Sequence, residues 1–163
     1  MKKFLIAVLM LSSFYSFSQK NNKKDAYKNK ALVEKLIINN WQKYSKSFEY
    51  ADYDNITSFF TYPVIFSLFG EPRVIKNKDE LVQLYKYIRT NLQNDYKYSI
   101  LDKTRIIWLS KELVLLDAKY SRFDSKYEPI YKGRGLYMYK LVNMEWKMFS
   151  VSNIPIIKPK KEG

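Results

Sequence analysis

The chain has 163 residues, and its 29 lysines and arginines outnumber its 16 aspartates and glutamates, which gives a net charge of +13. This length has room for one domain with one hydrophobic core. Cysteine and histidine are both absent, which excludes disulfides, thiol chemistry, the usual zinc ligands and the imidazole proton shuttle. We therefore expect no cofactor and no metal.

The positive charge favours anionic surroundings. The lysines are dispersed along the chain, however, and no arginine-rich helix or RNA-binding motif accompanies them. We expect a solvated lysine-rich surface rather than a nucleic-acid interface. Contact with an anionic envelope surface remains an alternative.

The N-terminus has the pattern of a secretory signal peptide. Lys2 and Lys3 precede an apolar run over residues 4–11, and small serines follow, so we expect cleavage after Ser18. The run is too short to span a bilayer, which needs about 20 residues. Residues 1–18 are thus expected to be a signal peptide, and the mature protein to be periplasmic or secreted. An uncleaved anchor or a buried first helix is the alternative.

The rest of the chain reads as a single domain over residues 26–153. A disordered polar segment is expected before it, over 19–25, and a basic tail after it, over 154–163. The domain opens with a long helix predicted over 26–49, because apolar residues recur there at steps of three and four. The expected apolar face consists of Leu32, Leu36, Ile37, Trp41, Tyr44 and Phe48.

A short helix and a hairpin are predicted next. The helix covers residues 55–61 and is expected to end because Pro63 disfavours helix in the residue before it. The hairpin pairs strands over 64–69 and 73–76.

A third helix and four strands complete the domain. Asn77 can cap the helix, with Glu80 three positions on to form a capping box, and we expect it to end near Asp95. The four predicted strands are 96–108, 113–123, 130–141 and 146–151.

Alternation along the strands predicts which side chains face inward. Asp117 is expected to face outward with Lys119. An inward Arg122 would need a carboxylate or an acidic ligand, unless it lies at the rim and reaches water. The aromatic residues either fill the core or line a cavity. The candidate ligand-binding residues are Trp41, Tyr44, Phe66, Tyr120, Arg122 and Tyr137.

Several segments together resemble the NTF2-like superfamily, which includes SnoaL-like polyketide cyclases and ketosteroid isomerase. They are the helix containing Trp41, the segment 52–64, the helix start 77–81 and the strand pair 136–148. The resemblance implies an NTF2-like α+β cone for 26–153, with a curved, mostly antiparallel sheet wrapped around the long N-terminal helix. It also implies a cavity between them and often a dimer through the outer sheet face. It implies no particular reaction.

Three functions remain open. The first, which we favour, is an exported non-catalytic protein that binds a small apolar or acidic ligand, or a partner protein, through its cone. The second is an enzyme of the SnoaL or ketosteroid isomerase type using carboxylate acid-base chemistry. Strand 64–69 lacks the aspartate base of that family, and only Asp102 or Asp117 remains to stabilise an oxyanion, so no catalytic residue is assigned. The third is a homodimeric accessory subunit that uses its sheet face.

Overall fold

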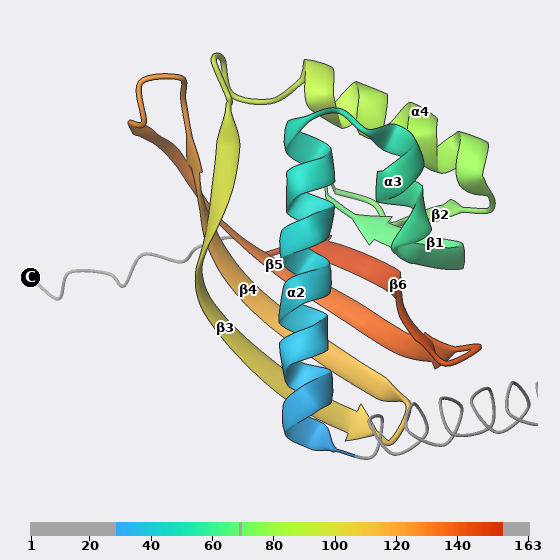
Figure 1. The fold of residues 1–163 in the computed structure, drawn as a ribbon. Coiled ribbons are helices and arrows are strands. Elements are labelled where there is room, and N and C mark those ends of the chain that lie inside the picture. The colour runs from blue at the N-terminus through green and yellow to red at the C-terminus, as the bar shows by residue number, and fades with distance from the viewer. Residues whose placement is uncertain (1–28, 69, 155–163) are drawn as a thin grey trace, which may run out of the picture. The chain divides into compact units, whose positions relative to one another are not determined.

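The computed structural model describes residues 29–68 and 70–154 (Figure 1). The predicted signal peptide, the polar segment 19–25 and residues 155–163 of the basic tail lie outside the described residues. Contacts divide the chain into two units, 1–38 and 39–163. The boundary falls inside helix α2 (Lys30–Glu49), so the described part of the first unit is the first half of this helix.

The second unit is an α+β structure built on one six-stranded sheet. The strand order is β2-β1-β6-β5-β4-β3, and every neighbouring pair is antiparallel except β1 with β6. This confirms the predicted fold class. The strands are β1 (Phe60–Ser67), β2 (Arg73–Ile75), β3 (Tyr98–Ser110), β4 (Leu113–Phe123), β5 (Pro129–Val142) and β6 (Glu145–Asn153), and the helices besides α2 are α3 (Tyr53–Ser58) and α4 (Lys78–Thr90).

The apolar face of α2 differs from the prediction. Leu32 and Leu36 are 50% and 39% exposed, whereas Val33 and Ile37 are buried. Four-residue steps from Val33 lead through Ile37 to Trp41, so the buried stripe follows this row and leaves the two leucines beside it. No helix in the described ranges is both long enough and apolar enough to cross a membrane.

The start of β1 corrects a second prediction. Helix α3 ends at Ser58, and β1 begins at Phe60, so Pro63 lies inside the strand instead of ending a helix. The Tyr62–Pro63 peptide bond is cis. The pairing of β1 with β6 is irregular between Phe60 and Ile65, and a residue without a backbone N–H is tolerated at such an irregularity.

Helix α4 begins as predicted and ends earlier. The Asn77 side chain accepts a hydrogen bond from the Glu80 amide at 3.0 Å, which confirms the cap. The helix ends at Thr90, not near Asp95, and β3 begins only at Tyr98. Residues 91–97 therefore form a connection rather than a helix end, and part of it reaches the candidate site.

The core lies on the inner face of the sheet. Val114, Leu116, Ala118 and Tyr120 of β4 are all 5% exposed or less, which confirms the predicted alternation. Trp41, on the predicted apolar face of α2, and Trp146 of β6 are each 3% exposed.

Candidate functional site

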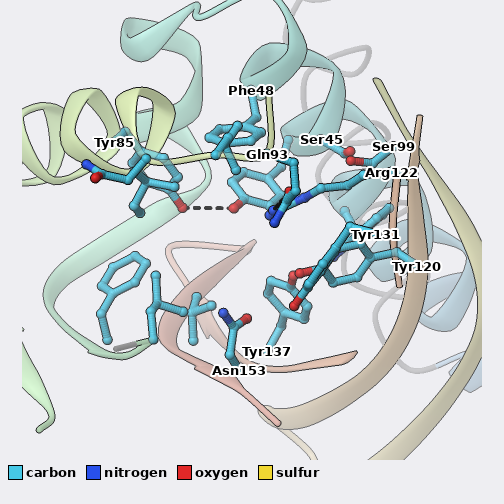
Figure 2. Close-up of a pocket in the computed structure, with 18 residues that line it drawn as sticks. Ser45, Phe48, Tyr85, Gln93, Ser99, Tyr120, Arg122, Tyr131, Tyr137 and Asn153 are labelled. Carbon is cyan, nitrogen blue, oxygen red and sulfur yellow. Dashed lines mark hydrogen bonds between the residues drawn. The ribbon is translucent and has the colours of Figure 1, made fainter. Parts of the chain in front are cut away.

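A cavity of about 140 Å³ lies within the second unit (Figure 2). Its walls come from the second half of α2, from α4 and the connection after it, and from strands β1, β3, β4, β5 and β6. In Figure 2, Tyr85 of α4 lies on one side of this space, and Tyr120, Tyr131 and Arg122 lie on the other.

The structure brings all six predicted ligand-binding residues together around this cavity. Helix α2 supplies two of them, β4 two, and β1 and β5 one each; they are Trp41, Tyr44, Tyr120, Arg122, Phe66 and Tyr137. That they bind a ligand stays a prediction.

The other lining residues were not predicted as part of the site, among them Tyr85, Gln93, Tyr131 and Asn153. Tyr131 pairs in register with Arg122. It lies an even number of residues before Tyr137 on β5, so both side chains face the same side of the sheet, and alternation could have identified it. Tyr85 was visible in the sequence only as part of the apolar stripe of α4. Gln93 was placed in the wrong element, and Asn153 lies at a strand end, where alternation gives no signal.

Arg122 is the only charged side chain among the described residues that line the cavity. Its Nη1 donates a hydrogen bond to Oε1 of Gln93 at 2.8 Å. Its buried Nε has no hydrogen-bond partner, and no carboxylate in the described ranges forms an ion pair with it. The guanidinium thus keeps an unused buried donor.

Three tyrosine rings surround this guanidinium. Its central carbon lies 5.0 Å from the ring centre of Tyr131, 5.5 Å from that of Tyr120 and 5.7 Å from that of Tyr96. Cation–π contacts at these distances stabilise a partly desolvated arginine and fix its position. They do not supply the hydrogen-bond acceptor that the Nε–H lacks.

The tyrosine hydroxyls in the site are neutral hydrogen-bonding groups. Tyr85 donates its hydroxyl to the Tyr44 hydroxyl oxygen at 3.0 Å, shown as the dashed line in Figure 2. Burial raises the pKa of Tyr44, Tyr85 and Tyr137 above the ordinary tyrosine value. Since that ordinary value is already about 10, these groups stay protonated at neutral pH and cannot serve as bases there.

Two glycines of β5 make room for two of the cavity's aromatic rings. Tyr120 pairs in register with Gly133 on the neighbouring strand. A Cβ atom on Gly133 would collide with the Tyr120 ring. A Cβ atom on Gly135 would come within 2.7 Å of Cε2 of Tyr137. The missing side chains let both rings lie close to the sheet, which keeps the space above them open.

Neither aspartate considered as an oxyanion stabiliser lines the cavity. Asp117 accepts hydrogen bonds from Nε and Nη2 of Arg134, each at 2.8 Å, and this arginine holds the pKa of Asp117 below its usual range. Asp102 accepts a hydrogen bond from the Ser121 hydroxyl at 2.8 Å. No aspartate, glutamate or lysine is found among the described lining residues.

The fold and its inner cavity define an NTF2-like domain. The family model described as "NTF2-like protein (DUF6841)" matches residues 34–155, and the chain belongs to this family. A search of curated proteins found no match.

Solved structures of other proteins share the fold. A Nostoc punctiforme protein of unknown function with a cystatin-like fold is similar at 13% identity and a TM-score of 0.64, over 77% of this chain and 94% of that one. An NTF2-like protein of unknown function from Pseudomonas putida is similar at 10% identity and a TM-score of 0.64, over 82% and 93%. An NTF2-like protein from Cytophaga hutchinsonii is similar at 14% identity and a TM-score of 0.58, over 76% and 98%. At these identities the likeness concerns the fold alone.

Proposed function

We propose that this chain is an exported, non-catalytic NTF2-like protein whose cavity binds a small carboxylic acid. The observation that carries the proposal is that Arg122, which lines an aromatic cavity, has a buried Nε–H with no acceptor among the described residues. Export rests on the signal-peptide pattern of residues 1–18.

The energetics of the arginine favour an acidic ligand. Arg122 is half-buried. A partly desolvated cation without a carboxylate partner is destabilised, and its buried hydrogen-bonding groups need acceptors. Gln93 supplies one neutral acceptor, to Nη1. A ligand carboxylate would add a charge-assisted bond at the Nε–H, and such bonds are about twice as strong as neutral ones.

The size of the cavity limits the ligand to about one ring. In another protein, an apolar cavity of about 150 Å³ holds benzene, and the cavity here measures about 140 Å³. Its walls include the rings of Trp41, Phe66 and Tyr137, which suit a flat apolar body. A single ring with one carboxylate, such as benzoate, therefore combines both requirements.

The lining argues for binding without turnover. Proton abstraction next to a carbonyl needs a base near the operating pH. The polar groups of the described lining residues are hydroxyls, amides and one arginine. Burial raises the pKa of Tyr44, Tyr85 and Tyr137, which moves it further from neutral pH.

Calorimetric titration with benzoate and benzamide tests the role of Arg122. Arg122→Ala should weaken benzoate binding about tenfold or more, because a hydrogen bond to a charged group contributes about 1.5 to 3 kcal/mol. Benzamide, which has the same ring and no charge, should bind parent and variant alike.

Lys111→Ala is the matched control, since it removes one positive charge in the turn between β3 and β4, away from the cavity. It should leave benzoate affinity unchanged. If Arg122→Ala loses as much affinity for benzamide as for benzoate, the arginine does not recognise the carboxylate. Turnover of an enolisable ketone, abolished by replacing one aspartate, would overturn the non-catalytic function.

A further inference from the structure

A group of cations crosses the face of the sheet opposite the cavity. Lys103 of β3 pairs in register with Lys119 of β4, and Lys119 pairs with Arg134 of β5. Lys119 directly precedes the inward-facing Tyr120, so this row lies on the outer face. Three like charges placed directly opposite one another on neighbouring strands destabilise a sheet.

One carboxylate partly offsets these charges. Asp117 lies on the same face, its side chain 9% exposed, and forms a two-bond pair with Arg134 at 2.8 Å. Arg105 reaches it more weakly, at 3.4 Å, with 68% of its side chain exposed. Neither Lys103 nor Lys119 forms an ion pair with another residue of the described ranges.

These side chains surround a recess of about 280 Å³. It is lined by Lys103, Thr104, Arg105, Asp117, Lys119 and Arg134, so four cations and one carboxylate leave a local charge of +3. We propose that this recess binds the phosphate group of a small soluble molecule. The site is separate from the cavity and does not depend on what the cavity binds.

The arrangement fits a compact, multiply charged anion. A phosphate offers several acceptor oxygens, which ammonium and guanidinium groups on three strands can approach together. A single carboxylate would leave more of the local charge unpaired. A flat lipid surface would engage cations spread over a broad area, whereas these lie around one recess.

Titration with inorganic pyrophosphate at low ionic strength tests the site. The parent should bind, and its unfolding midpoint should rise with ligand concentration because only the folded state offers the site. Lys119→Gln removes the central cation and should weaken pyrophosphate binding about tenfold or more. Lys111→Gln lowers the net charge equally, outside the recess, and should bind like the parent.

Stability without ligand provides a second measurement. Lys119→Gln relieves the repulsion within the row, so in phosphate-free buffer its unfolding midpoint should equal or exceed that of the parent. A lower midpoint there would show that Lys119 is an ordinary stabilising residue and would overturn the argument.

Three outcomes of the binding experiment contradict the proposal. One is the absence of pyrophosphate binding by the parent. Another is an equal loss in the Lys119 and Lys111 variants, which would mean that net charge alone attracts the anion. The third is binding to phosphatidylglycerol vesicles, but not to phosphatidylcholine vesicles or to pyrophosphate, which would make the occupant a lipid surface.

Discussion

Replacing Trp146 by alanine should destabilise the protein by about 3 to 5 kcal/mol, the usual cost of removing a large buried aromatic side chain. Trp146 is 3% exposed on β6, and its ring meets that of Trp108 edge to face, with centres 5.9 Å apart. Since the free energy of unfolding of a native protein is only about 5 to 15 kcal/mol, the variant should be close to unfolding. Urea unfolding followed by circular dichroism measures the change.

Trp146→Phe is the matched control. It keeps an aromatic ring beside Trp108 and removes the indole N–H, which is buried without a hydrogen-bond partner. We expect it to cost much less than the alanine variant, because less volume is lost and one unsatisfied donor disappears. An alanine variant with the parent's urea midpoint would mean that the inner face of β6 is misassigned.

Gly133→Ala should abolish benzoate binding while leaving the protein folded. The new Cβ atom would collide with the ring of Tyr120, and that ring lines the cavity. The ring can escape by swinging off the sheet into the open space, so the stability cost should stay within about 1 to 3 kcal/mol, as for other small-to-large changes. Calorimetry with benzoate, alongside urea unfolding, separates the two effects.

A double-mutant cycle with Tyr120→Ala checks this cause. Once the ring is absent, the added methyl group has nothing to displace, so Gly133→Ala should cost little further stability or affinity in that background. Additive losses would show that the glycine acts through the backbone instead. Full benzoate affinity in Gly133→Ala would show that the cavity is not where benzoate binds.

Much of the fold could be predicted because two patterns in the sequence are strong. Alternation over β4 placed Tyr120 and Arg122 inward and Asp117 outward, as the structure has them. The Asn77 cap was visible from the spacing of Asn77 and Glu80. Both signals are local, so they survive without knowledge of the tertiary structure.

The errors fall where local patterns are ambiguous. On α2, apolar residues occupy adjacent positions, so Leu32 and Leu36 fit a helical stripe as well as Val33 does, and tertiary burial decides between them. A proline disfavours helix in the residue before it, so a helix was expected to end just before Pro63. Pro63 instead lies within β1. The end of α4 was missed because Leu92 continues the helical spacing beyond Thr90.

The site could be predicted only where its residues belong to regular elements. All six predicted residues lie on α2 or on strands of the sheet. Gln93, the hydrogen-bond partner of Arg122, lies in the connection after α4, where periodicity is lost. The sequence suggested that an inward arginine needs an acceptor, but only the structure shows that its Nε–H lacks one.

The most direct test of the proposed binding site is the NMR signal of the Arg122 Nε–H during a titration with benzoate. The described structure gives this group no acceptor, so a ligand carboxylate that binds it should shift its proton signal downfield and slow its exchange with water. Benzamide should leave the signal almost unchanged. If benzoate saturates the protein while the Arg122 signal stays in place and those of Arg105 and Arg134 move, the acid binds on the outer face and the cavity is not the site.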